Sequence, residues 1–255
     1  MPLRLLTGGE VEKIRIVLSV YQDGSGMVKH QDGTLPGWRD FERTVALVLR
    51  GEAQEDKSIF DVLLPSHYTN RKIGISCKMR SELDRVDRTG RVYFELSNSE
   101  GKFWNRLGLR GIHKRNYLNK PGEVGHEVIS LVEGWHHQVS VQQGGLVELR
   151  KSFYLVLSWN TAGDYQLYQF PIVLPSAHSL RWRFPSRRCL RGEDAQGTLF
   201  EWYGESGGQL KYYPLASSAT WVSKRFRLEP IPPGQGGILG RVRGYFPSHH
   251  EALWS

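Results

Sequence analysis

The chain has 255 residues, of which 39% are hydrophobic and 24% charged, so it can bury a sizeable core and does not belong to the disordered class. No stretch approaches the ~20 apolar residues of a membrane-spanning helix, the N-terminus lacks the apolar segment of a secretory signal, and two cysteines cannot form a disulfide framework. A net charge of +8 indicates an anionic partner, and the cytoplasm is the expected compartment.

The N-terminal part has the spacing of helices. Apolar residues recur at helical intervals over 10–21, and a loop rich in glycine and aspartate follows. A second helix is predicted over 38–50, with an apolar stripe that begins at Trp38 and with Gly51 as the residue that ends it. We therefore expect helices before the first strand.

Short strands follow. Residues 58–65 form an apolar run closed by proline, and residues 74–79 and 91–97 alternate between apolar and polar. The charged segment 81–91 is predicted to be a loop, and the residues after 97 open another helix. This order of elements predicts an α/β core.

The C-terminal part is rich in strand-like segments separated by glycine, proline and serine. A hairpin is expected around Asn160–Asp164, and further strand-like pieces continue to about residue 230. We therefore predict a single domain over residues 1–255 of the α+β class, a mixed sheet flanked by helices. Its catalytic core would span about 36–130, and a β-rich lobe for DNA recognition about 150–230.

Three residues of the N-terminal half form a chemically suggestive set. Asp61 interrupts an apolar run, and because an unpaired buried carboxylate is costly, it must face outward or have a partner. A tight turn between the two strands would bring it beside Lys78, and Glu42 lies on the preceding helix beside the apolar stripe. Two acids and a lysine can surround a divalent cation and a water. Without a shared function, Glu42 would be a solvated acid on its helix, and Asp61 and Lys78 would form a structural ion pair.

Residues 38–79 resemble the catalytic core of PD-(D/E)XK nucleases, and most closely that of type II restriction endonucleases. In that family a helix carries a glutamate, a strand carries an aspartate, and the next strand carries an acid-x-lysine pair. Glu42, Asp61 and Lys78 match these three positions. The resemblance implies a restriction-endonuclease-like core in which Asp61 binds the metal and Lys78 acts in catalysis.

The chain departs from that pattern in two places. Phe60 replaces the usual proline, and Ser76 stands where the family usually has an acid. A serine at this position is similar to the Ser-x-Lys pair of restriction endonucleases that cut CCGG-containing sites. The missing acid would then come from elsewhere, with Glu42 favoured over Glu95, which is expected on the next strand of the same sheet as Lys78. The carbonyl of Cys77 is a further candidate ligand. Carboxylate and carbonyl oxygens suit Mg²⁺, with Mn²⁺ or Ca²⁺ as substitutes in binding, and the cation would lower the pKa of an attacking water that Lys78 orients.

Other candidates for metal or nucleophilic chemistry are weaker. The histidine pairs at 136–137 and 249–250 would point apart on a strand, which favours structural or surface roles over metal binding. Cys77 has no histidine nearby in the sequence, so its strand position favours packing over a role as nucleophile.

Two segments carry the positive excess: residues 71–120 hold 13 basic and 5 acidic side chains, and residues 181–255 hold 11 and 6. Arginines suit contacts with phosphates and base edges. The CCGG-cutting enzymes have an Arg-x-Asp-Arg group past the lysine, which Asp84 and Arg85 match, although Glu82 replaces the first arginine. The candidate DNA-binding residues are Arg80, Asp84, Arg85, Arg88, Arg181, Arg183, Arg187, Arg188 and Arg191.

These observations predict a Mg²⁺-dependent endonuclease of a restriction-modification system that cuts double-stranded DNA at a specific site and leaves 5′-phosphate ends. Symmetric cuts in a palindrome would require two active sites, so a homodimer is expected. Two alternatives stay open. One is a nuclease of DNA repair or recombination, similar to a junction resolvase, and the other is a DNA-binding protein without catalysis.

Overall fold

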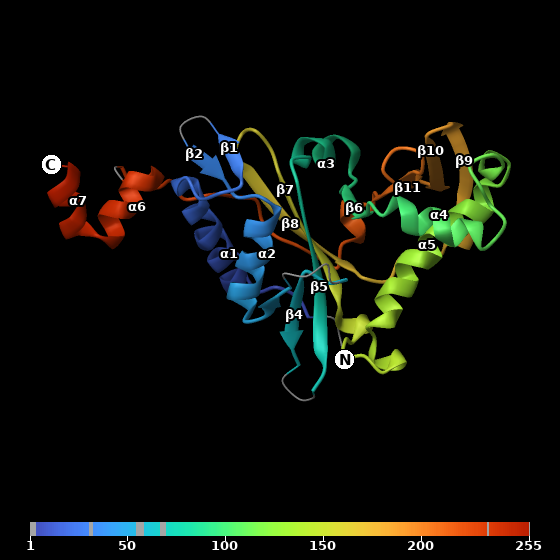
Figure 1. Ribbon diagram of the computed structural model, residues 1–255, viewed down its shortest axis with the longest axis horizontal. Coiled ribbons are helices and arrows are strands. Elements are labelled where there is room, and N and C mark those ends of the chain that lie inside the picture. The colour runs from blue at the N-terminus through green and yellow to red at the C-terminus, as the bar shows by residue number, and fades with distance from the viewer. Residues whose placement is uncertain (1–3, 31–32, 55–58, 67–69, 234, 255) are drawn as a thin grey trace.

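Two sheets built from interleaved parts of the chain organise the molecule (Figure 1). The computed structural model describes residues 4–30, 33–54, 59–66, 70–233 and 235–254. Helices pack against both sheets, and strands dominate the part of the chain after residue 150. The predicted class, a mixed sheet flanked by helices with further β structure toward the C-terminus, is confirmed.

The larger sheet, here the core sheet, has seven strands within the described residues, in the order β13-β8-β7-β5-β4-β3, with β14 also paired to β8. Its strands are antiparallel except for β5 and β7, which run parallel. A parallel pair needs a crossover connection, and residues 81–152 provide it. The strands are β3 (Glu52–Ala53), β4 (Val62–Pro65), β5 (Lys72–Arg80), β7 (Phe153–Trp159), β8 (Asp164–Pro171), β13 (Trp221–Val222) and β14 (Phe226–Arg227).

Two N-terminal helices cover one face of the core sheet. Helix α1 (Gly8–Val20) begins at a capping box formed by Thr7, and α2 (Trp38–Leu49) buries Phe41 and Val45 against the sheet. Both helices were predicted from their apolar spacing, but two details differ. Trp38 is half exposed. Helix α2 ends at Leu49, followed by Arg50 in the left-handed region (φ 56°), rather than at Gly51.

The smaller sheet has five strands in the described part of the chain, in the order β6-β12-β11-β10-β9. Helices α4 (Glu100–Gly108) and α5 (Pro121–Gln138) cover one of its faces, where Phe200 and Trp202 are fully buried (Figure 1). We call the other face, on which these strands carry polar side chains, the open face. The strands are β6 (Phe94–Ser97), β9 (Arg181–Ser186), β10 (Cys189–Asp194), β11 (Gly197–Tyr203) and β12 (Gln209–Tyr212).

The division between the sheets differs from the predicted division of the chain. Strand β6 falls within the expected catalytic core, at 36–130, yet it pairs with β12 of the smaller sheet. Conversely, β7 and β8 fall within the expected lobe at 150–230, yet they form the centre of the core sheet. The predicted hairpin around Asn160–Asp164 is confirmed, but it belongs to the core sheet and not to a separate β-rich lobe. These pairings join distant segments, which local sequence patterns do not specify.

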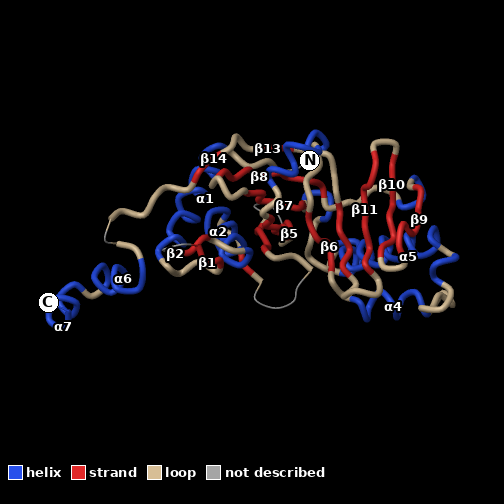
Figure 2. The backbone as a smooth tube through the Cα atoms, turned by 90° about the horizontal axis from the view of Figure 1, so that it is seen from above, coloured by secondary structure: helices blue, strands red, loops and turns tan. Residues whose placement is uncertain are grey.

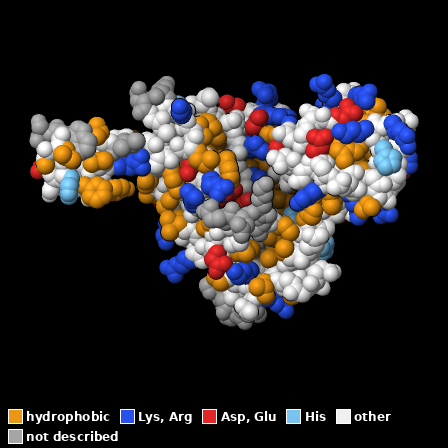
Figure 3. Space-filling view, viewed as in Figure 1, with side chains coloured by type: hydrophobic (Ala, Val, Ile, Leu, Met, Phe, Trp, Pro, Cys, Tyr) orange, Lys and Arg blue, Asp and Glu red, His pale blue; other side chains and the backbone are white. Residues whose placement is uncertain are grey.

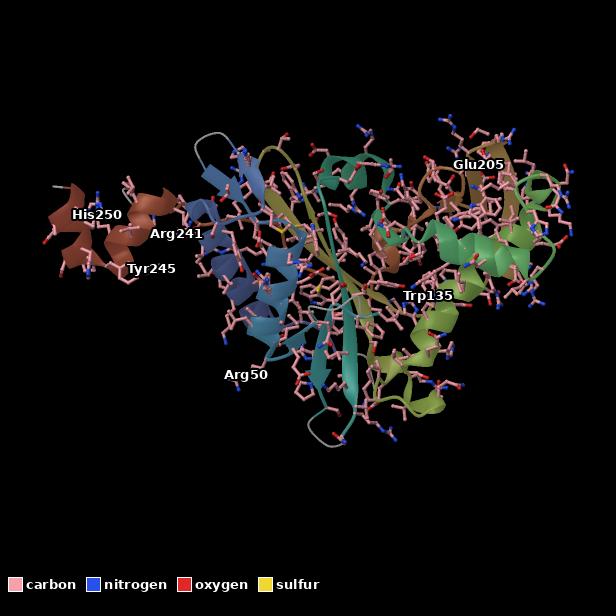
Figure 4. All side chains as sticks on the ribbon, in the orientation of Figure 1. Arg50, Trp135, Glu205, Arg241, Tyr245 and His250 are labelled. Atoms are coloured by element: carbon pink, nitrogen blue, oxygen red, sulfur yellow. The ribbon has the colours of Figure 1, made fainter. Side chains whose placement is uncertain are left out.

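The C-terminal helices α6 (Gly237–Tyr245) and α7 (Pro247–Trp254) form an arm that extends from the body (Figure 2). Figure 4 labels Arg241, Tyr245 and His250 on this arm. Arg241 contacts Asp23 of the body at 3.6 Å. None of the helices among the described residues is long and apolar enough to cross a membrane. The remaining elements are β1 (Val28–His30), β2 (Gly33–Leu35), α3 (Leu83–Thr89) and the 3₁₀ helices η1 (Tyr21–Asp23), η2 (Tyr117–Asn119), η3 (Val141–Gln143), η4 (Leu149–Lys151), η5 (Ala177–Ser179) and η6 (Ala216–Ser218).

Candidate active site

Asp61 and Lys78 meet at the edge of the core sheet where β4 begins. Val62 pairs with Ile75, so Asp61, immediately before the strand, lies opposite Ser76. It was expected inside the strand, but β4 starts one residue later. Its backbone N–H still donates to the Ile75 carbonyl at 3.0 Å, which fixes its position against β5. Residues 58 and 67–69, at the start of the predicted run and in the predicted turn, lie outside the described residues.

The Asp61 carboxylate gathers three groups on one oxygen. Its Oδ2 accepts a hydrogen bond from the backbone N–H of Cys77 at 2.7 Å and one from the Ser76 hydroxyl at 3.2 Å. The Lys78 ammonium lies 3.7 Å from the same oxygen. About a quarter of each charged side chain is exposed, 25% for Asp61 and 22% for Lys78. The predicted neighbourhood of Asp61, Ser76 and Lys78 is therefore present, and solvent reaches it.

Alternation along β5 divides its residues between the two faces of the core sheet. Ser76 and Lys78 share a face with Tyr154, which packs in the hydrophobic cluster under α5. Cys77 points to the opposite face, into the cluster under α2. Because the N–H and C=O of a strand residue point to the same edge, and the Cys77 N–H donates to Asp61, the Cys77 carbonyl is directed toward Asp61 as well.

The two candidate acids have different surroundings. Glu42 on α2 lies near the buried Cys77: burial, then the charges of Asp61 and Glu42, raise the pKa of the Cys77 thiol well above its ordinary value. That thiol stays protonated at neutral pH, which agrees with packing rather than nucleophilic chemistry. Glu95 was expected on the same sheet as Lys78, and this is wrong, since β6 belongs to the smaller sheet. Its carboxylate lies 3.7 Å from Arg80.

The oxygen atoms around Asp61 suit a hard cation. Within the described residues, Asp61 Oδ1 takes part in none of the contacts above, and the Cys77 carbonyl is directed to the side of β5 on which Asp61 lies. The described chain contains no group of three or more His, Cys, Asp or Glu side chains arranged to hold a metal ion. Mg²⁺ commonly binds through one or two carboxylates and fills its remaining positions with water and substrate oxygens. The donors present fit that mode.

The first predicted DNA-contacting segment is a helix, not a loop. Residues 83–89 form α3, because Leu83 and Val86 are buried one turn apart and hold the segment on the body. Asp84 accepts a hydrogen bond from the Asn160 side chain at 2.8 Å, which ties α3 to the β7–β8 hairpin. Arg88 is exposed. Arg85 lies 3.9 Å from Glu82.

The second predicted segment forms the β9–β10 hairpin. Three of its arginines form ion pairs within the smaller sheet, Arg183 with Glu193, Arg191 with Glu201 and Arg187 with Glu205. The charges of these three are thus partly balanced by the protein itself. Arg181 and Arg188 are exposed.

His136 is a residue near the site that the sequence pattern did not reveal. It lies on α5, not on a strand, and its ring packs 5.8 Å from Phe60 and 6.1 Å from Tyr154. Burial, followed by the charges of Lys78 and His137, lowers the pKa of His136 to about 4. A neutral imidazole therefore lies beside the lysine. The only sequence signal was the apolar spacing of α5, which puts His136 on the same face as Val128 and Val132.

No family model, curated protein or solved structure was found to match this chain.

Proposed function

We propose that this chain is a metal-dependent endonuclease that hydrolyses phosphodiester bonds in double-stranded DNA, of the restriction type, and leaves 5′-phosphate ends. The observation that carries the proposal is the pairing of Lys78 with Asp61, 3.7 Å apart at a partly exposed edge of the core sheet. A helix acid, an aspartate at the start of a strand and a lysine on the paired strand follow in the order that the resemblance implies. The basic balance of the chain suits a polyanionic substrate.

Asp61 has the role of metal ligand in this proposal. Its Oδ2 is fixed by the Cys77 N–H and the Ser76 hydroxyl, and its Oδ1, which takes part in neither bond, would bind the metal. Glu42 is the favoured further acid. When bound there, Mg²⁺ would neutralise charge on the phosphate and lower the pKa of the attacking water.

Lys78 has the role of stabilising the reacting phosphate. In the hydrolysis, a water oxygen bonds to phosphorus, the bond from phosphorus to the 3′ oxygen breaks, and the leaving oxygen takes a proton. Negative charge increases on the phosphate oxygens during this step, and a fixed ammonium lowers its energy. Neutral His136 next to Lys78 adds no competing positive charge to the site.

The proposed nuclease function implies the partners of this chain. Double-stranded DNA would be the substrate, and two symmetric cuts in a palindromic site would need a two-fold homodimer with one site in each subunit. A nuclease of repair or recombination would use the same residues on branched or damaged DNA. The restriction and repair candidates therefore differ in their DNA substrate and not in their active-site residues.

The test is digestion of a sequenced circular plasmid with Mg²⁺ by the wild type and by Asp61→Asn and Lys78→Gln. We expect discrete fragments from the wild type and a loss of at least about 10²-fold in rate for each variant. Lys72→Gln is the matched control, because Lys72 lies on the same strand and pairs with Glu52 at 2.6 Å, away from Asp61. It should cut as the wild type does.

Each result separates the candidates. Diffuse or branch-dependent cutting would favour the repair nuclease. DNA binding without cutting in Mg²⁺ or Mn²⁺ would contradict catalysis and leave the binding protein, with Asp61 and Lys78 as a structural ion pair. Equal rates in all three variants would reject this site even if the wild type cuts DNA.

A further inference from the structure

The open face of the smaller sheet carries a row of charged side chains that crosses every strand. On β11, Trp202 points into the core while Glu201 and Tyr203 point the other way. Residues directly opposite one another on neighbouring strands continue from Glu201 in both directions. We call this set the charged row. Its members, from β6 to β9, are Glu95, Lys211, Glu201, Arg191 and Arg183.

Both carboxylates beside Lys211 are engaged by other groups. Glu95 lies 3.7 Å from Arg80. Glu201, buried at 7% exposure, accepts hydrogen bonds from Arg191 at 2.7 Å and from the hydroxyl groups of two tyrosines at 2.7 and 2.9 Å. Burial acts to raise the pKa of Glu201, but these hydrogen bonds outweigh it and the pKa is lowered. Glu201 is therefore ionised, its carboxylate oxygens are occupied by these three hydrogen bonds, and it fixes both tyrosine rings.

Tyrosine rings hold Lys211 in place. Its ammonium lies 4.4 Å from the ring centroid of Tyr203 and 5.5 Å from that of Tyr93. Within the part of the chain that the structure describes, it contacts these rings and no carboxylate. A ring face attracts a cation without neutralising its charge, so the rings hold the Lys211 ammonium in place without an ion-pair partner among the described residues.

Two arginines share the Tyr93 ring with Lys211. Arg85 lies 5.8 Å from Tyr93 and 5.2 Å from Tyr213, which stacks on Tyr93 at 5.3 Å. Arg80 lies 5.2 Å from Tyr93. Arg80 comes two residues after Lys78 on the same strand and so on the same face. A continuous set of cations therefore leads from the candidate active site to the open face.

We propose that Lys211, held by Tyr93 and Tyr203, binds a phosphate of the DNA backbone beside the Asp61–Lys78 site. This inference rests on the proposed function and adds to it a contact from the smaller sheet. The rings that hold Lys211 have cations on their faces and so are less open to stacking by bases. A phosphate is therefore the favoured ligand. Figure 3 shows Lys and Arg side chains interspersed with Asp and Glu over the end of the molecule formed by β9–β11.

The experiment measures binding of a mixed-sequence DNA duplex by fluorescence anisotropy, in Ca²⁺, between about 50 and 200 mM salt. Loss of one phosphate contact reduces the slope of log K against log salt by about 0.9, so Lys211→Gln should weaken binding about fivefold at low salt and flatten the dependence by that amount. Lys211→Arg keeps the charge and the ring contact and should bind as the wild type does.

Lys114→Gln is the matched control. Lys114 also lies over an aromatic ring, that of Trp104 at 5.4 Å, but Trp104 packs on Trp202, on the face opposite the charged row. This variant should keep the wild-type slope. Thermal unfolding of all variants detects any loss of folding, and Lys211→Arg then decides whether charge or packing matters.

The outcomes are distinct from those for catalysis. If the wild type binds and cuts DNA while Lys211→Gln keeps affinity and slope, the Lys211 contact is rejected and the nuclease proposal stands. If Lys211→Gln alters binding to one sequence only, base reading replaces phosphate binding. If the wild type neither binds nor cuts DNA, both proposals fail.

Discussion

The carboxylate of Asp61 and the backbone N–H of Cys77 form a 2.7 Å hydrogen bond between the residue before β4 and the middle of β5. The bond continues the pairing of the two strands beyond Val62, the first residue of β4, by means of a side chain. Asp61 thus has a structural role through Oδ2 and, in the proposed function, a separate role as metal ligand through Oδ1. Substitutions that keep one and remove the other can separate these roles.

The first prediction compares Asp61→Ala with Asp61→Asn. Alanine leaves the N–H of Cys77 without its acceptor, which costs about 1–3 kcal/mol of unfolding free energy. Asparagine keeps an acceptor oxygen and should cost clearly less, while both variants lose DNA cleavage because the charge is gone. Urea unfolding and plasmid digestion measure the two effects. Equal stability of the variants would show that the bond contributes little, and cleavage by Asp61→Asn would exclude it as the essential ligand.

The second prediction concerns the acid that replaces the one missing at Ser76. Glu42 lies near Cys77, whereas Glu95 is paired with Arg80. Glu42→Gln should therefore raise the Mg²⁺ concentration for half-maximal cleavage by about tenfold or more, and Glu95→Gln should leave it near the wild-type value. Cleavage rates over a Mg²⁺ titration test this. The reverse result would assign the ligand to Glu95 and leave the nuclease proposal intact.

A third prediction concerns the docking of α5 on the smaller sheet. A Cβ on Gly125 would lie 2.2 Å from the Trp182 ring, whose indole N–H is fixed by a 2.9 Å bond to the Ala177 carbonyl. Gly125→Ala should therefore destabilise the protein by about 1–3 kcal/mol. On the same helix nothing lies within 4 Å of a Cβ on Gly134, so Gly134→Ala should stabilise by about 0.5–1 kcal/mol. Opposite shifts of the melting temperature are expected, and shifts of the same sign would contradict this packing.

The fourth prediction is a pH dependence of stability due to His136. Its pKa falls from the ordinary 6.5 to about 4 in the folded protein, mainly through burial and then through the charge of Lys78. Above pH 6.5 the ring is neutral in both states. Between pH 6.5 and 4 only the unfolded state takes up the proton, so up to about 3 kcal/mol of stability is lost as the pH falls through this window.

The comparison that isolates this effect is His136→Gln, which cannot titrate. Carboxylates elsewhere also reduce stability in acid, so the slope of unfolding free energy against pH should be shallower in the variant, and not zero. Parallel curves for the variant and the wild type between pH 4 and 6.5 would show that His136 is protonated as easily in the folded protein as in the unfolded chain.

The elements that carry the candidate site could be predicted because they are local. The apolar spacing of α2 and the two runs around Asp61 and Lys78 are short segments close in sequence, so their pairing follows from one turn. Helix α3 was missed because Leu83 and Val86 provide its only buried apolar contacts within a charged segment. The glycines of α5 similarly weaken its helical pattern, although Gly125 is needed to admit Trp182.

The role of the smaller sheet could not be predicted from local patterns. Whether β6 pairs with β5 or with β12 depends on segments more than a hundred residues apart, and no spacing within residues 91–97 distinguishes the two. Lys211 could not be identified for the same reason. Its tyrosine partners come from β11 and from the residue before β6, and only the folded sheet brings them together.

The interleaving of the two sheets has a consequence for how this protein can be altered. The chain runs from β5 to β6, returns to β7 and β8, leaves again for β9–β12, and returns to β13 and β14. Neither sheet is encoded by one continuous stretch, so neither could be replaced as a single segment with two junctions. A change to one face of the smaller sheet would therefore have to arise by substitution in place, strand by strand.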